Sequence, residues 1–113
     1  MSRVFVTGGS GVIGGALIAR LVERGDEVLA LARSDAAVAA VQKRGARPVR
    51  GDALDPEALA RGMDGCALAF HVAGVNALCV KDPEAMRRVN VDGAVLAVQA
   101  AKRAGVPRLA SSR

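Results

Sequence analysis

Glycines crowd one short segment near the start of the chain, at a spacing that could hold the phosphates of a nucleotide. Residues 4–15 read VFVTGGSGVIGG, which is an apolar run, a glycine-rich turn and the start of a second apolar stretch. Glycine tolerates a positive φ and lets backbone N–H groups approach a pyrophosphate closely. A helix that begins after the turn would add its unpaired N–H groups and the positive end of its dipole. The segment therefore predicts a site for the phosphates of a dinucleotide.

Two spacings of these glycines fit that chemistry. Gly9, Gly11 and Gly14 match the pattern GxGxxG, whereas Gly8, Gly11 and Gly14 match the wider pattern TGxxGxxG that begins at Thr7. Both registers stay open. The pattern is informative because a strand is expected before the turn, and a helix and a second strand after it. We expect Gly14 and Gly15 to let this helix pack closely on the sheet.

The end of the second expected strand bears on which dinucleotide would bind. Residues 27–32 read EVLALA, and Arg33 follows them. A carboxylate at this place would bond the ribose 2′-hydroxyl of NAD, whereas a guanidinium can bind a 2′-phosphate through two hydrogen bonds. The small Ala32 leaves room for a phosphate, so the sequence favours NADP, with NAD as the alternative. Asp35 lies close enough to complicate this choice, and a solvated loop position for Arg33 remains the competing interpretation.

The rest of the chain alternates strands and helices that would position these residues. Strands are expected over residues 4–6, 27–32, 48–50, 67–72 and 108–111. Helices are expected from residue 12 to a stop at 24–26, over 36–43, from 56 onward and over 82–103. Ser34 or Asp35 can cap the second helix, and Asp55 can cap the third, with Pro56 at its first position. This order predicts an α/β fold, a doubly wound parallel sheet of about five strands with helices on both faces. Ligands bind such sheets outside the carboxyl ends of the strands.

The composition predicts one globular domain over residues 1–113. With 51% hydrophobic residues, the chain is long enough for one core and too short for two. It holds no run of about 18 uncharged apolar residues, and the first strand follows almost directly on Met1, so we expect no membrane span, no signal peptide and a cytoplasmic location. The net charge of +5 comes from scattered arginines with only 2% aromatic residues, which argues against nucleic-acid binding. Cys66 and Cys79 lack a CxxC spacing, and we expect both to be reduced, with no metal site.

Five stretches along the chain resemble one superfamily. They are TGGSGVIGGAL at the start, GDALD at 51–55, HVAG at 71–74, VNVDGAVLAVQAAKRAGV at 89–106 and RLASS near the end. The chain resembles the extended short-chain dehydrogenase/reductase superfamily, of the NAD-dependent epimerase/dehydratase type. The resemblance implies a Rossmann-type domain that is the N-terminal, NAD(P)-binding part of a longer protein. It does not identify a substrate.

The resemblance also implies which residues contact the cofactor. The glycine turn and the first helical turn would line the pyrophosphate, with Arg33 beside the adenosine ribose. Asp52 and the alanine after it would flank the adenine, where a carboxylate can accept a hydrogen bond from the exocyclic amine. Residues 72–74 would pass under the riboses, and Asn90 would have either a structural or a direct catalytic role. The full set is Thr7, Gly8, Gly11, Val12, Ile13, Gly14, Arg33, Asp52, Ala53, Val72, Ala73, Gly74 and Asn90.

The catalytic residues that the resemblance implies are only partly present. Ser112 matches the family's serine or threonine that hydrogen-bonds the reacting oxygen. The family's general acid/base is a tyrosine in a Tyr-x-x-x-Lys pattern, and this chain has no tyrosine. The single histidine, His71, is a poor candidate for the base, because it lies within a buried strand. The sequence therefore predicts cofactor binding without turnover by this chain alone, and leaves open whether the chain acts as an enzyme.

Three expectations follow from a chain that ends at Arg113, before the sixth strand and the substrate region of the family. A second polypeptide could supply the tyrosine and lysine, and only then would a small-molecule substrate bind. The alternative function is a non-catalytic module that senses the redox state of the nucleotide. The fifth strand would be left as an open sheet edge, which predicts self-association.

Overall fold

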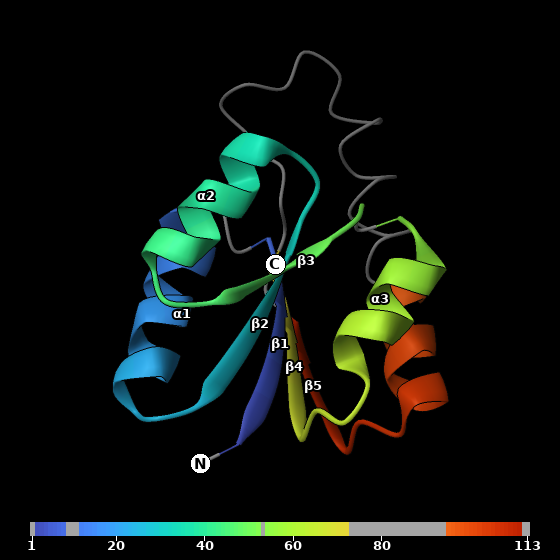
Figure 1. The fold of residues 1–113 in the computed structure, drawn as a ribbon. Helices are drawn as coiled ribbons and strands as arrows, with labels where there is room; N and C mark the ends of the chain where they lie inside the picture. Colours follow the sequence, from blue (N-terminus) through green and yellow to red (C-terminus); the bar gives the residue numbers. More distant parts are fainter. Residues whose placement is uncertain (1, 9–11, 53, 73–94, 112–113) are drawn as a thin grey trace.

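One parallel sheet forms the centre of the molecule. The structure is a computed structural model that describes residues 2–8, 12–52, 54–72 and 95–111. The five strands lie in the order β3-β2-β1-β4-β5, and all neighbours are parallel (Figure 1). The strands are β1 (Arg3–Thr7), β2 (Glu27–Ala32), β3 (Arg47–Arg50), β4 (Leu68–His71) and β5 (Arg108–Ser111). The predicted doubly wound α/β fold is confirmed.

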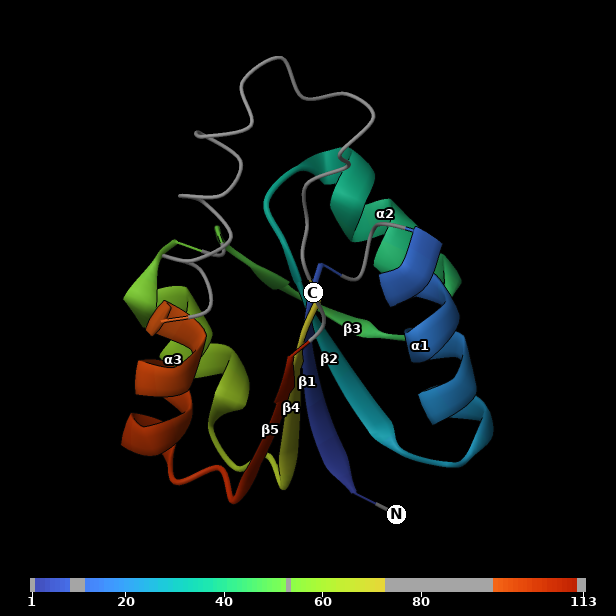
Figure 2. The same cartoon turned by 180° about the vertical axis from the view of Figure 1, so that it is seen from behind.

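Helices cover both faces of this sheet. Helices α1 (Val12–Glu23) and α2 (Asp35–Lys43) lie on one face, while α3 (Pro56–Met63) and the helical residues 95–104 lie on the other, as the opposite views in Figures 1 and 2 show. Alternation along β1 divides the core between the faces, since Val4 and Val6 pack with α1 and α2 whereas Phe5 packs with α3. Gly62 lets α3 approach closely, because a Cβ there would overlap the Phe5 ring. None of the described helices is long and apolar enough to cross a membrane.

The ends of the elements follow local capping chemistry. The Ser34 hydroxyl accepts a hydrogen bond from the Ala37 amide at 3.1 Å, so Ser34 caps α2 and Asp35 is its first residue. The Asp55 carboxylate accepts one from the Glu57 amide at 3.0 Å, with Pro56 opening α3 as expected.

Three strands differ from the expected bounds by one residue at an end or both. In β1 and β3 the strand starts earlier, at Arg3 and Arg47, because backbone pairing needs no apolar side chain there. The last helix is described over 95–104, and the expected stretch 82–94 lies outside the described residues.

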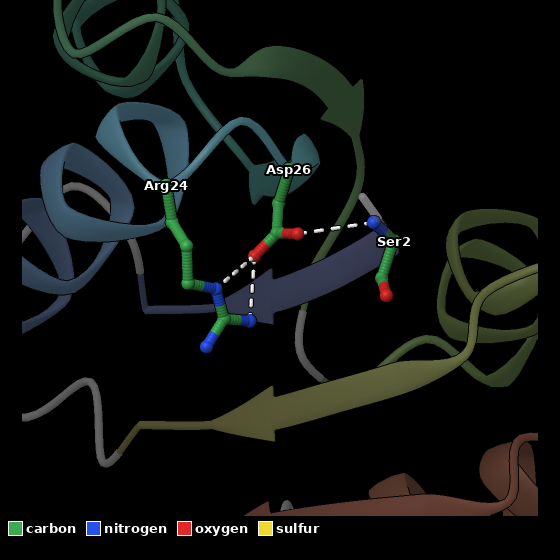
Figure 3. Close-up of polar contacts among 3 residues, drawn as sticks. All are labelled: Ser2, Arg24 and Asp26. Carbon is green, nitrogen blue, oxygen red and sulfur yellow. Dashed lines mark hydrogen bonds and ion pairs between the residues drawn. The ribbon is translucent and has the colours of Figure 1, made fainter.

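The amino ends of the strands carry a closed polar cluster, drawn in Figure 3. One oxygen of the Asp26 carboxylate accepts a hydrogen bond from the Ser2 amide at 3.0 Å. The other accepts one from Arg24 Nε at 2.9 Å and lies 2.6 Å from Arg24 Nη2. The hydrogen bond from Ser2, followed by the bond and charge of Arg24, holds the pKa of Asp26 below its usual range, although burial opposes this shift. The cluster ties residue 2 to the loop between α1 and β2.

Candidate dinucleotide-binding site

The carboxyl ends of the strands bring most of the described candidate residues to one edge of the sheet. Because β1 lies between β2 and β4 and all three run the same way, the residues that follow them meet at this edge. Helix α1 also begins there, directly after the glycine turn, at the edge opposite the chain's N-terminus (Figure 1). We call this side of the molecule the carboxyl edge. Its described candidate residues are Thr7, Gly8, Val12, Ile13, Gly14, Arg33, Asp52 and Val72.

Gly8 occupies a position that only glycine can fill. Its φ is +73°, in the left-handed region that side chains rarely adopt. A Cβ on Gly8 would also lie 2.6 Å from the carbonyl oxygen of Val72, which follows β4. The Val72 amide in turn donates to the Thr7 carbonyl at 3.3 Å. The turn after β1 is therefore packed directly against the end of β4.

A hydrogen bond between two buried side chains supports this junction. Thr7 Oγ1 and His71 Nδ1 lie 2.9 Å apart, and the two residues are register partners at the last positions of β1 and β4. Burial lowers the pKa of His71, which favours the neutral ring. Sequence reasoning missed this contact, although both residues are polar at the ends of otherwise apolar strands. The partner of His71 is thus a neighbouring strand's hydroxyl, which gives the ring a structural role.

The first turn of α1 presents contrasting side chains. Ile13 is 71% exposed, although it is a large apolar residue, and Gly14 is buried. Val12 is the first residue of the helix. An exposed isoleucine next to the glycine turn is available for an apolar contact with a ligand at the helix start.

Arg33 and Asp35 both follow β2, but they differ in their ion pairs. Arg33 is exposed and forms no ion pair with any residue that the structure describes. Asp35 is paired, because its Oδ1 lies 2.8 Å from Nη1 of Arg50, the last residue of β3. Asp35, whose carboxylate complicates the choice between NADP and NAD, therefore has Arg50 as its counter-ion.

Asp52 follows β3 and organises the turn that leads into α3. Its Oδ1 accepts a hydrogen bond from the Leu54 amide at 2.9 Å, and its carbonyl accepts one from the Asp55 amide at 2.9 Å. Asp52 is exposed, and Oδ2 accepts no hydrogen bond from the described residues. One carboxylate oxygen thus shapes the loop, while the other is available to a donor.

Several candidates lie outside the described residues, namely Gly9, Gly11, Ala53, Ala73, Gly74, Cys79, Asn90 and Ser112. The two glycine registers therefore both stay open. In the described ranges, no three histidine, cysteine or acidic side chains gather where a metal ion could bind. The thiol of Cys66 is buried, its pKa is raised by that burial, and it donates to the Gly62 carbonyl at 3.4 Å, so it has a packing role.

Known proteins and solved structures are similar to this chain over most of its length. A ketoreductase acting on a farnesylated dihydroquinoline oxide in Stigmatella aurantiaca is 42% identical over 107 residues, which are 95% of this chain and 32% of that protein. A putative dihydroflavonol 4-reductase of Synechocystis is 39% identical over 104 residues, or 92% of this chain and 30% of the relative. The crystal structure of gox2253 superposes with a TM-score of 0.86 and 35% identity, covering 96% of this chain and 33% of that one. The chain thus spans about a third of the length of these relatives.

A model of the NAD-dependent epimerase/dehydratase family matches residues 4–112, which is nearly the whole chain. Members of this family bind NAD(P), and the strand order β3-β2-β1-β4-β5 matches that of doubly wound dinucleotide-binding sheets. The chain therefore belongs to the NAD-dependent epimerase/dehydratase family, within the extended short-chain dehydrogenases/reductases that its motifs indicate.

Proposed function

We propose that these 113 residues are the NAD(P)-binding portion of an extended short-chain dehydrogenase/reductase and bind the dinucleotide at the carboxyl edge. The observation that carries the proposal is Gly8, which is held at a φ of +73° against the Val72 carbonyl. This contact fixes the end of β1 directly before the glycine-rich segment and the start of α1, where backbone N–H groups and a helix N-terminus can receive a pyrophosphate.

The residues around Gly8 would contact different parts of the dinucleotide. Thr7, fixed by His71, holds the end of β1, and the backbone at the start of α1 stabilises the phosphate charge. The exposed side chain of Ile13 and the end of β4 at Val72 offer apolar surface to a flat ligand. Asp52 Oδ2 can accept a hydrogen bond from an adenine amine. When bound, the nicotinamide ring of the cofactor supplies hydride transfer.

We further propose that NADP is the preferred cofactor, with NAD as the alternative. An exposed guanidinium at Arg33 without a described ion pair can bind a 2′-phosphate through two hydrogen bonds. The nearby Asp35 does not oppose it with a free charge, because Arg50 neutralises that carboxylate.

We propose that turnover needs residues in addition to these 113. The sequence contains no tyrosine, so the family's Tyr-x-x-x-Lys pair must come from elsewhere, while Ser112 would hydrogen-bond the reacting oxygen. A small-molecule substrate would enter only with that additional part. We also propose that β5, which pairs with β4 alone among the described strands, lets copies of the chain associate, and concentration-dependent sedimentation tests this.

Fluorescence titration with NADPH and NADH tests the binding proposal. In Arg33→Gln, the Kd for NADPH should rise about tenfold, because the guanidinium bonds to the phosphate are lost, while the Kd for NADH changes less than about twofold. Arg47→Gln is the matched control, since Arg47 is an exposed arginine at the opposite end of the neighbouring strand. Equal effects on both cofactors in Arg33→Gln would contradict the role given to Arg33.

A further inference from the structure

We propose that Arg50 is a second specificity-determining residue for the 2′-phosphate, acting by neutralising Asp35. The inference rests on the proposed function, because it concerns how the same carboxyl edge distinguishes NADP from NAD. Its starting point is the ion pair between Arg50 Nη1 and Asp35 Oδ1 at 2.8 Å.

The fold brings this pair to the end of β2. Arg50 and Ala32 are register partners on β3 and β2, so Arg50 stands beside the residue that immediately precedes Arg33. Asp35 is the first residue of α2, in a turn fixed by the Ser34 cap. Arg33, Asp35 and Arg50 thus belong to one short stretch of the carboxyl edge, where the adenosine ribose of a dinucleotide lies in a sheet of this type.

A second contact fixes the end of β3 from the other face. Nη2 of Arg61, on α3, donates a hydrogen bond to the Arg50 carbonyl at 2.8 Å. The backbone of Arg50 is therefore tied to α3, while its side chain reaches to α2. The end of β3 is thus in contact with helices on both faces of the sheet.

The charge near the end of β2 influences whether the adenosine ribose of NAD or the 2′-phosphorylated ribose of NADP binds more tightly. A free carboxylate would accept hydrogen bonds from the ribose hydroxyls of NAD and repel the 2′-phosphate of NADP. With a guanidinium 2.8 Å away, the charge of the Asp35 carboxylate is offset by Arg50, whereas Arg33 forms no ion pair with a described residue. Both members of the pair are exposed, and exposed pairs add little to stability, so removing Arg50 should change specificity and leave the fold intact.

The test compares the Kd values for NADPH and NADH in Arg50→Gln, Asp35→Asn and the double variant. Arg50→Gln should raise the Kd for NADPH about tenfold, because the uncovered carboxylate opposes the phosphate. The Kd for NADH should fall by no more than about twofold, because the same carboxylate can accept hydrogen bonds from the ribose hydroxyls. Asp35→Asn should tighten NADPH about threefold, and the double variant should return to within about threefold of the unchanged chain. Arg47→Gln removes the same charge from the same strand and breaks its pair with Glu27, at 3.8 Å, so it should leave the ratio of the two Kd values unchanged.

The outcomes separate this inference from the proposed function. Binding of NADPH with an unchanged Kd ratio in Arg50→Gln would overturn the inference alone, as would a double variant that keeps the full loss, since Arg50 would then contact the phosphate itself. If Arg50→Gln fails to fold, the Kd for NADPH in Asp35→Asn tests the inference instead. An unchanged Kd in Asp35→Asn would count against it. A wild-type chain that binds neither cofactor overturns the proposed function, and this inference with it.

Discussion

The two ends of the parallel strands differ in how their polar side chains and glycines are packed. We call the side where the strands begin the amino edge, opposite the carboxyl edge. At the amino edge, the Asp26 carboxylate is 3% exposed and is occupied on both oxygens by Ser2 and Arg24 (Figure 3). At the carboxyl edge, Arg33 is exposed with no ion pair to a described residue, and Ile13 presents an apolar side chain to solvent. The Asp26 cluster has all its carboxylate oxygens occupied, whereas Arg33 and Ile13 are available for a ligand.

Two glycines with almost the same backbone conformation sharpen this contrast. Gly105, at the amino edge before β5, has a φ of +75° and no described atom within 4 Å of an added Cβ. Gly8, at the carboxyl edge, has a φ of +73° but is packed against the Val72 carbonyl. Gly105 only ends a helix, while Gly8 also sets how closely two strand ends meet. We therefore expect a substitution at Gly8, and not one at Gly105, to affect dinucleotide binding.

Replacing Gly8 should give the largest effect. In Gly8→Ala the Cβ would lie 2.6 Å from the Val72 carbonyl oxygen, so the backbone at Gly8 must move and the proposed phosphate site should be disrupted. We expect the affinity for both NADPH and NADH to fall at least about thirtyfold, with a loss of stability of about 2–3 kcal/mol. Titration and urea unfolding measure the two effects.

Gly105→Ala is the matched control for this variant. It adds the same methyl at the same φ without a clash, so it should cost about 1–2 kcal/mol of stability and leave both affinities unchanged. If the two variants lowered the affinities equally, the contrast between the edges would be wrong.

Removing the Asp26 carboxylate should give the next largest effect, and on stability alone. Asp26→Asn loses the ion pair to Arg24 and weakens the bond to Ser2, so the melting temperature should fall by about 5 °C. The ratio of the NADPH and NADH affinities should not change. A shift in that ratio would show that the amino edge is coupled to the site.

Asp26 should also set how the amino edge responds to acid. Its pKa is lowered on folding from an ordinary value of 3.8, so the unfolded chain takes up the proton first as the pH falls. The stabilisation is complete above about pH 5 and is lost as the pH drops through 3.8 toward the lower folded value. Melting curves of the wild type and Asp26→Asn between pH 3 and 6 should converge at the acid end.

The smallest effect is expected at His71, and at a higher pH. Burial lowers its pKa from 6.5, so stability should decline as the pH falls from about 6.5 toward the folded value, by a few degrees in melting temperature. His71→Asn keeps a polar partner for Thr7 and should flatten this part of the profile. The same slope in both proteins would exclude His71 as its source.

The sequence predicted the scaffold better than the contacts within the site. Strand β2 was expected over its observed residues, and the Asp55 cap was expected where it occurs, because apolar periodicity and capping act within a few neighbouring residues. The contacts of Thr7 with His71 and of Asp35 with Arg50 were missed. Each joins residues on different elements, and it depends on strand register and rotamers that local patterns do not encode.

Titration of the wild-type chain with NADPH and NADH shows whether a dinucleotide binds at all, and which one binds more tightly. We expect saturable binding of NADPH at a lower Kd than NADH, with no turnover by these residues alone. No binding of either cofactor up to about 1 mM would contradict the claim that the carboxyl edge is a dinucleotide site.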